Sequence, residues 1–258
     1  MPEHELFSLN GQVAVVIGGG GVLGGAMATG LAQAGADIAI LGRSREHAEA
    51  QAKSIVTLGR KAIGIACDAA SKANLQQALA AILADFGHVD ILVNAAGVNS
   101  GTPFFEITEE EWQHILDIDL KSVFLACQVF GKAMVDAGRG GSIINISSAS
   151  SGPPLSKVLT YAVAKAGVNQ ITQFLARELA PNKIRVNAIL PGFFPAEQNR
   201  KLLTGERVAS ILAHTPMQRF GESSELVGAA VYLASHRASS FVTGSILKVD
   251  GGFTAMTI

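Results

Sequence analysis

Two side chains capable of acid/base chemistry, Tyr161 and Lys165, lie four residues apart. Residues at this spacing share one face of a helix, so a phenol and an ammonium would point the same way. A nearby positive charge favours a phenolate, which suits a tyrosine to exchange a proton with a carbonyl or alcohol oxygen. Tyr-x-x-x-Lys also arises often by chance, and these residues alone favour the alternative, a structural tyrosine beside a solvated lysine.

Short apolar runs rich in β-branched residues alternate with longer helical patterns along the chain. The expected strands cover residues 13–17, 38–41, 62–66, 91–93, 142–146, 184–189 and 245–249. The expected helices cover residues 22–34, 45–58, 72–86, 109–137, 160–180, 198–213 and 223–235. Continuous apolar strands that alternate with helices predict a parallel sheet covered on both faces. The expected fold class is therefore α/β, with one Rossmann-type doubly wound domain over residues 1–258.

A run of glycines, Gly18–Gly21, lies between the first expected strand and the first expected helix. Gly19, Gly21 and Gly24 fit the pattern G-x-G-x-x-G, in which glycines let the backbone approach a pyrophosphate at a helix N-terminus. A flexible turn without a ligand is the alternative. We expect a dinucleotide cofactor in contact with Gly18, Gly20, Gly21, Leu23 and Gly24.

The type of cofactor depends on the end of the second expected strand, which reads Leu41-Gly42-Arg43-Ser44. NAD-binding sites usually place an Asp or Glu here to bind the adenosine ribose. Arg43 can instead bind a 2′-phosphate through charge-assisted hydrogen bonds. We therefore predict NADP(H) in preference to NAD(H), and a solvated Arg43 without a cofactor role is the alternative.

Composition argues against several classes of function. The 258-residue chain is 48% hydrophobic and 16% charged, and its net charge of −1 without a basic block argues against nucleic acid as a partner. No apolar run is long enough to cross a bilayer. The polar N-terminal residues lack a secretory pattern, and the two cysteines, Cys67 and Cys127, make no disulfide framework. We expect a cytoplasmic protein without a membrane partner or a metal site.

Five further motifs resemble the short-chain dehydrogenase/reductase family, in the same order and across nearly the whole chain. These motifs are Asp68, Asn94-Ala-Ala-Gly97, Ser148, Asn187 with Pro191-Gly192, and Val249-Asp-Gly-Gly252. Ser148 precedes Tyr161 by thirteen residues, which is the spacing of the family's catalytic serine. A narrower resemblance points to D-mannonate oxidoreductases (fructuronate reductases), with gluconate 5-dehydrogenases as relatives. It is carried by residues 17–24, 191–194, 197–200 and 214–217.

The resemblance implies a mechanism. In the family the nicotinamide gives a hydride to a ketone carbon, and the catalytic tyrosine, here Tyr161, protonates the oxygen. Lys165 would activate the tyrosine and bond the nicotinamide ribose, and Ser148 would hydrogen-bond the reacting oxygen. The resemblance also implies cofactor contacts at Asp68, Asn94, Ala96, Gly97, Tyr161, Lys165, Pro191, Gly192 and Phe194.

One departure from the family pattern bears directly on the proton supply. Asp119 stands where the family usually has an asparagine, whose amide helps to hold a water in a proton relay. An ionised aspartate accepts hydrogen bonds but cannot donate them, and its charge would raise the pKa of Lys165. We place Asp119 among the catalytic residues, in a modified relay. Weakened catalysis and an ordinary charged helix residue are the alternatives.

A sugar-acid substrate needs a cation for its carboxylate and polar groups for its hydroxyls. Lys157, between Ser148 and Tyr161, and Arg200 are the candidate cations. The other candidates for substrate contact are Ser148, Tyr161, Asn99, Ser150 and Gln198. Residues 191–216 are the least sheet-like part of the chain, and we expect them to form a substrate lid. The alternatives are solvated side chains and a surface excursion.

Members of the family commonly form tetramers. The apolar stretch 123–129 and the tail 253–258 agree with buried interfaces, so we expect a homotetramer. Its expected substrate is a small sugar acid of the D-mannonate/D-fructuronate type. A gluconate 5-dehydrogenase, a general polyol dehydrogenase and a 3-oxoacyl thioester reductase stay open as enzyme alternatives. A cofactor-binding protein with weak catalysis also stays open, although the retained Ser148, Tyr161 and Lys165 argue against it.

Overall fold

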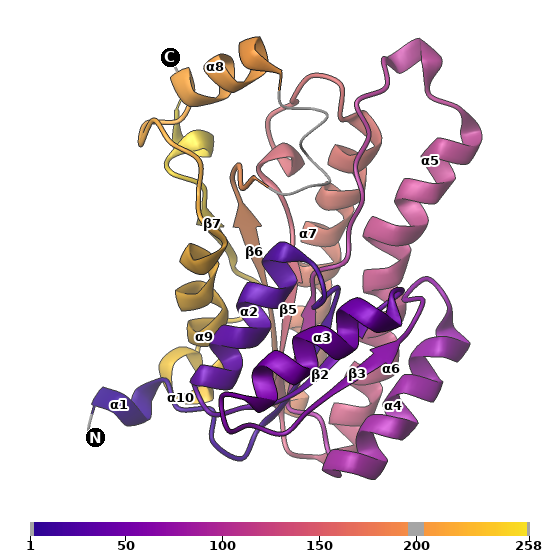
Figure 1. Cartoon of the computed structure of the whole chain (residues 1–258), viewed down its shortest axis with the longest axis vertical. Coiled ribbons are helices and arrows are strands. Elements are labelled where there is room, and N and C mark those ends of the chain that lie inside the picture. The colour runs from indigo at the N-terminus through magenta and orange to yellow at the C-terminus, as the bar shows by residue number, and fades with distance from the viewer. Residues whose placement is uncertain (1–2, 196–203, 257–258) are drawn as a thin grey trace.

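A seven-stranded parallel sheet forms the centre of the computed structural model, which describes residues 3–195 and 204–256 (Figure 1). The strands are β1 (Val13–Ile17), β2 (Asp37–Gly42), β3 (Ala62–Ala66), β4 (Ile91–Asn94), β5 (Gly141–Ile146), β6 (Ile184–Pro191) and β7 (Ile246–Val249). Their order is β3-β2-β1-β4-β5-β6-β7, and every neighbouring pair is parallel. The order reverses between β1 and β4, as in a doubly wound sheet, which confirms the predicted fold class.

Apolar side chains of the central strands point alternately to the two faces of the sheet. In β1, Ala14 and Val16 join the core on one face, whereas Val13, Val15 and Ile17 join the core on the other. All five are buried, since both faces are covered by helices. A strand buried in this way reads as a continuous apolar run, and this is the pattern that the sequence shows.

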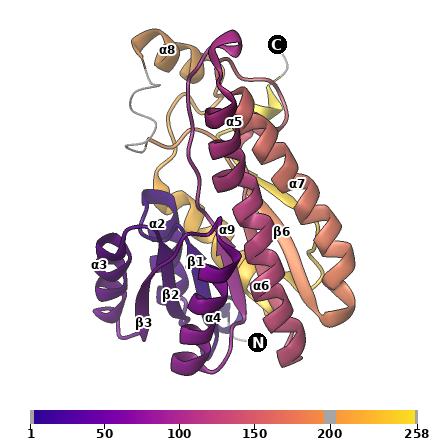
Figure 2. The ribbon, with the colours of Figure 1, turned by 90° about the vertical axis from the view of Figure 1, so that its right-hand side faces the viewer.

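Helices cover both faces of the sheet (Figure 2). One face carries α2 (Val22–Gln33), α3 (Arg45–Val56) and α9 (Val227–Ala234). The other carries α4 (Lys72–Phe86), α6 (Ser122–Ala137) and α7 (Leu159–Leu179). The short α1 (Glu3–Leu6) and α10 (His236–Ser239) lie at the opposite end of the molecule from α5 (Glu109–Leu116) and α8 (Gly205–Ala213). Loops at the α8 end follow the carboxyl ends of the strands, where ligands bind in such folds.

The helix expected over residues 109–137 is divided in two. A π-helical turn, Asp117–Lys121, joins α5 to α6. Such turns insert a wider loop of backbone into a helix and are frequent at functional sites. Here the turn contains Asp119, whose side chain is fully buried. The interpretation of Asp119 as an ordinary charged residue on a helix surface is therefore excluded.

Other boundaries shift by small amounts. The last residue of β6, Pro191, pairs with Val249, so this strand is longer than expected. The described part of the helix expected over 198–213 begins at Gly205, where Thr204 caps the new helix by accepting a hydrogen bond from the Arg207 N–H. Within residues 3–195 and 204–256, no helix combines the length and apolar character needed to cross a membrane.

The stretch 123–129, expected at a subunit interface, faces mostly inward. Val123, Cys127 and Val129 lie on the inner side of α6 and are buried in the chain's own core, and Phe253 of the expected tail interface is buried as well. The apolar composition of this stretch is thus explained by packing against the sheet. Among its apolar side chains Phe124 differs, because about half of it (49%) remains exposed.

Candidate active site

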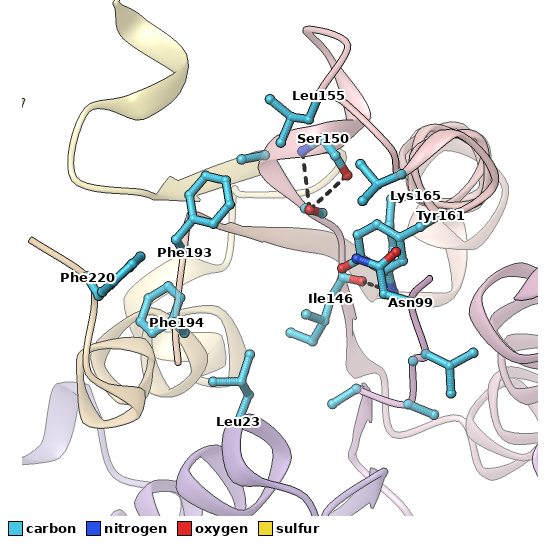
Figure 3. A pocket seen from close by; sticks show the side chains of 18 of the residues that line it. Leu23, Asn99, Ile146, Ser150, Leu155, Tyr161, Lys165, Phe193, Phe194 and Phe220 are labelled. Carbon is cyan, nitrogen blue, oxygen red and sulfur yellow. Dashed lines mark hydrogen bonds between the residues drawn. The ribbon is translucent and has the colours of Figure 1, made fainter. Parts of the chain in front are cut away.

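Tyr161 and Lys165 lie near the start of α7 and line the same pocket (Figure 3). Lys165 is only 3% exposed, so the alternative of a solvated lysine is excluded. Its Nζ donates to the Ile146 carbonyl oxygen at 3.0 Å and lies 5.5 Å from the centre of the Tyr161 ring. The bond to the end of β5 fixes the ammonium beneath the phenol.

Asp119 connects three elements around Lys165. Its Oδ1 lies 3.3 Å from Lys165 Nζ, and its Oδ2 accepts a hydrogen bond from the Val98 N–H at 2.9 Å. Gly97 makes this approach possible, since a Cβ at that position would lie 2.7 Å from Asp119 Oδ1. The carboxylate thus joins the π-helical turn, the loop after β4 and α7 at one buried point.

Neighbouring negative charge keeps Lys165 protonated. Burial alone would lower the pKa of Lys165, but the charges of Asp119 and Tyr161 outweigh it, and the net shift is upward. Burial raises the pKa of the Asp119 carboxyl, against the opposing effects of Lys165 and the Val98 N–H. The direction of the shift in the Lys165 pKa agrees with the expectation for Asp119. Lys165 is therefore an ammonium at neutral pH.

Ser148 lines the pocket together with Tyr161. It follows β5 and caps a short 3₁₀ turn, where its Oγ accepts hydrogen bonds from the Ser150 N–H at 3.2 Å and the Ser150 hydroxyl at 3.0 Å (Figure 3). A hydroxyl oxygen has two lone pairs and one proton. With both acceptor sites used, the Ser148 hydroxyl has its proton left for a ligand oxygen.

Only some of the predicted substrate residues line the catalytic pocket. Asn99 and Ser150 line the pocket with Ser148 and Tyr161. Lys157 does not belong to the described lining, because the chain turns there with a left-handed φ of 64° and leaves the residue exposed. Gln198 and Arg200 lie outside the described residues.

Several lining residues were not predicted from sequence. Phe193 and Phe220 line the pocket together with the predicted Phe194, and we call these three residues the phenylalanine wall. Arg207, on α8, lines the pocket as well. The Arg207 guanidinium donates to the Ser156 carbonyl oxygen at 3.1 Å and to its hydroxyl at 3.3 Å. No motif marks Arg207 in the sequence, since its position depends on how α8 folds back over the pocket.

A second cavity of about 640 Å³ runs along the glycine turn. It contains most of the predicted cofactor residues: Gly18, Gly20, Gly21, Leu23, Gly24, Arg43, Asp68, Ala96 and Gly97. Gly18 has a φ of 79°, and a Cβ there would lie 2.7 Å from the Ala96 nitrogen, so the turn requires glycine. The volume falls within the range of about 300–1,000 Å³ that is usual for small-molecule sites. The residues present fit a nucleotide cofactor.

The remaining predicted cofactor residues lie around this cavity. Gly192 and Phe194 line the catalytic pocket instead, directly after Pro191 at the end of β6. Asn94 is buried below the cleft, and its amide donates to Asn145 Oδ1 at 2.8 Å, so it supports the floor from beneath. Sequence reasoning missed His47, which lines the cavity beside Arg43.

Comparison with known proteins decides the family. The sequence model of a family described as enoyl-(acyl carrier protein) reductase matches residues 21–254. The 2-dehydro-3-deoxy-D-gluconate 5-dehydrogenase of Escherichia coli is 39% identical, over 96% of this chain and 98% of its own length. The chain belongs to the short-chain dehydrogenase/reductase family. It is therefore an NAD(P)-dependent oxidoreductase that acts on CH–OH groups.

Solved structures of short-chain dehydrogenases extend the comparison. The gluconate 5-dehydrogenase of Burkholderia cenocepacia, in complex with NADP and tartrate, has a TM-score of 0.94 and 34% identity, over 98% of this chain and 99% of its own. A Haemophilus influenza protein named as a D-mannonate oxidoreductase, with bound NAD, has a TM-score of 0.91 and 35% identity, over 97% of each chain.

Proposed function

We propose that this oxidoreductase interconverts a ketone and a secondary alcohol on a sugar acid, with NADP(H) as the hydride carrier. The observation that carries the proposal is the single pocket that Tyr161, Ser148 and the buried Lys165 line together. Relatives named for gluconate-type substrates support the substrate class. Within that class we propose the D-mannonate/D-fructuronate pair, in line with the name of the Haemophilus protein.

Each catalytic side chain has one task in this proposal. NADPH, when bound, supplies the hydride to the carbonyl carbon. The Tyr161 hydroxyl gives its proton to the carbonyl oxygen during reduction and takes it back during oxidation. Lys165 stabilises the negative charge that proton transfer leaves on the tyrosine oxygen. Ser148 donates a hydrogen bond from its hydroxyl to the same carbonyl oxygen, keeps its proton and fixes the position of that oxygen.

Asp119 is a positioning residue in this scheme. Its carboxylate holds Lys165 by a direct ion pair, at the place where the family usually has a neutral amide. The carboxylate keeps the lysine charged, and because the described hydrogen bond of the ammonium goes to the Ile146 carbonyl oxygen, ammonium protons remain for a ligand hydroxyl. We therefore prefer a modified relay to weakened catalysis.

The cofactor preference rests on the adenosine end of the cleft. Arg43, Ser44 and His47 lie together there, and all three are exposed. The guanidinium of Arg43 and the hydroxyl of Ser44 suit the phosphate group that distinguishes NADP from NAD. Asp68 is the one carboxylate in this described lining, and it follows β3 rather than β2. We propose Arg43 as the residue that selects NADP(H).

We also propose that the described parts of the expected lid, residues 191–195 and 204–216, help to enclose the substrate, because Gly192, Phe194 and Arg207 all line the pocket. The rest of the expected lid lies outside the described residues. A homotetramer stays a prediction. It is supported by exposed apolar side chains on α6 and α7, namely Phe124, Leu159, Val163 and Phe174. The cytoplasmic location also stays a prediction.

A substrate screen tests the proposed function. NADPH oxidation is measured with D-fructuronate, 5-keto-D-gluconate and an acetoacetyl thioester at equal concentrations. We expect the highest kcat/KM with D-fructuronate and measurable turnover with 5-keto-D-gluconate. Turnover of the thioester alone would replace the proposal with a 3-oxoacyl thioester reductase. Binding of NADPH without turnover of any ketone would indicate a cofactor-binding protein.

A further inference from the structure

The catalytic pocket contains two cations among its described lining residues, Lys165 and Arg207. Lys165 is engaged by Asp119 and by the Ile146 carbonyl group. Arg207 has no carboxylate partner within residues 3–195 and 204–256. Its charge in this pocket therefore stays available to an anionic ligand.

The contacts of Arg207 orient it without neutralising it. Its two terminal nitrogens each donate one hydrogen bond to Ser156, through the carbonyl oxygen and the hydroxyl. A guanidinium has five N–H donors in a planar fork, so three donors remain after these two bonds. Ser156 lies in the loop between Ser148 and Tyr161, and the bonds attach α8 to the loop that carries the catalytic groups. The arginine is thus held in place for a further planar partner.

The surroundings of Arg207 strengthen an ion pair. The phenylalanine wall and Leu155 line the same pocket, and Arg207 itself is half-buried. Figure 3 shows the phenylalanine wall across the pocket from Tyr161. An attraction between opposite charges grows as the local dielectric falls, so a carboxylate inside this pocket is bound more strongly than one in water. The hydroxyl and amide groups of Ser148, Ser150 and Asn99 remain for the hydroxyls of the ligand.

We propose that Arg207 binds the carboxylate of the substrate and makes the enzyme prefer a keto acid to the matching neutral ketose. The assignment rests on the proposed sugar-acid function. It moves the carboxylate-binding role from Lys157, which lies outside the described pocket lining, to a residue of α8. Arginine suits this role because its fork matches the two carboxylate oxygens.

The test compares two substrates that differ only at one terminal carbon. D-fructuronate has a carboxylate where D-fructose has a CH₂OH group. We expect Arg207→Gln to lower kcat/KM for D-fructuronate about ten- to a hundredfold, chiefly through KM, as is usual for loss of a charge-assisted hydrogen bond. The kcat/KM for D-fructose should fall much less, because D-fructose has no carboxylate to lose a partner. Arg207→Lys, which keeps the charge but loses the fork, should fall between the wild type and Arg207→Gln.

Two control variants remove a positive charge elsewhere. Lys157→Gln removes the exposed cation of the neighbouring loop, and Arg237→Gln removes an arginine of α10 at the opposite end of the molecule (Figure 1). Both should retain the wild-type preference for the acid. Calorimetric titration of the NADPH-saturated protein with D-mannonate, a pair that cannot react, gives a second measurement, in which only the Arg207 variants should bind more weakly.

The outcomes separate the two proposals. A wild-type preference for D-fructuronate that Arg207→Gln abolishes supports both. A preference that survives in Arg207→Gln overturns the assignment of Arg207 and leaves the sugar-acid function intact. Equal losses on both substrates show that Arg207 only holds α8 in place, which also overturns the assignment. A wild type that shows no preference for the acid overturns the sugar-acid function and the carboxylate role together.

Discussion

The two cations of the catalytic pocket have opposite surroundings. Lys165 lies on the floor of the pocket, where the sheet, the π-helical turn and α7 meet, and it is paired with a buried carboxylate. Arg207 lies on the outer wall, half-buried, and its described partner is the neutral Ser156. A substitution in the buried Lys165–Asp119 pair disturbs the fold, whereas a substitution on α8, which lies over the pocket, need not. We infer that the floor performs the chemistry and that the wall selects the substrate.

The largest expected effect is at the floor. Tyr161→Phe removes the proton donor while keeping the ring, and kcat should fall about 10²- to 10⁴-fold, the usual contribution of general acid/base catalysis. NADPH binding, followed by the change in its fluorescence, should stay close to that of the wild type. Tyr232→Phe is the matched control, because Tyr232 lies on α9 and does not line the pocket. Substantial turnover by Tyr161→Phe would contradict the assigned role.

The next effect is on stability. Asp119→Leu leaves the Lys165 charge buried without its partner, and the free energy of unfolding should fall by about 3–5 kcal/mol. Chemical denaturation of the wild type and the variant measures this difference. Glu49→Gln breaks the exposed pair between Arg45 and Glu49 and should leave stability within error. Equal, small losses in both variants would show that the floor is not held by this ion pair.

Asp119→Asn distinguishes the two interpretations of the departure from the family pattern. An amide keeps a hydrogen-bond acceptor near Lys165 but removes the charge. We expect kcat to fall, because the carboxylate holds the ammonium in place. A several-fold rise in kcat would instead show that Asp119 weakens catalysis by this protein.

A smaller effect is expected from substitution of Arg43, which should weaken the preference for NADPH over NADH. Arg43→Ala removes the proposed bond to the 2′-phosphate, and KM for NADPH should rise about ten- to a hundredfold, as for loss of a charge-assisted hydrogen bond. KM for NADH should not change, since NADH has no 2′-phosphate. Steady-state kinetics with both cofactors measure the effect. A wild type that prefers NADH would contradict the assignment of Arg43.

The smallest expected effect is on the pH dependence of stability. The pKa of Lys165 in the folded protein lies above its ordinary value of 10.5. The stabilisation by this shift is therefore fully present below about pH 10.5 and is lost as the pH rises through the folded pKa. In thermal denaturation from pH 8 to pH 12, the wild type should lose more stability above pH 10.5 than Lys165→Met does. Parallel curves for the two proteins would contradict the prediction.

The sequence predicted the floor better than the wall. Strands that are buried on both faces have a continuous apolar pattern, which the sequence shows directly. The sequence also shows the spacings between Ser148, Tyr161 and Lys165, which identify the catalytic residues of the floor. Asp119 was identified as a departure, but the π-helical turn that buries it has no signal in the sequence. Arg207 was missed because its place depends on a tertiary contact between α8 and Ser156, about 50 residues apart along the chain.

A crystal structure with NADP and D-mannonate tests the division between floor and wall most directly. We predict that the substrate hydroxyl to be oxidised lies within hydrogen-bond distance of Tyr161 Oη and Ser148 Oγ. Its carboxylate should accept two hydrogen bonds from the Arg207 guanidinium. A carboxylate bound away from Arg207, with the reacting hydroxyl still on Tyr161, would contradict the proposed task of the wall. A substrate that contacts neither Tyr161 nor Ser148 would contradict the account as a whole.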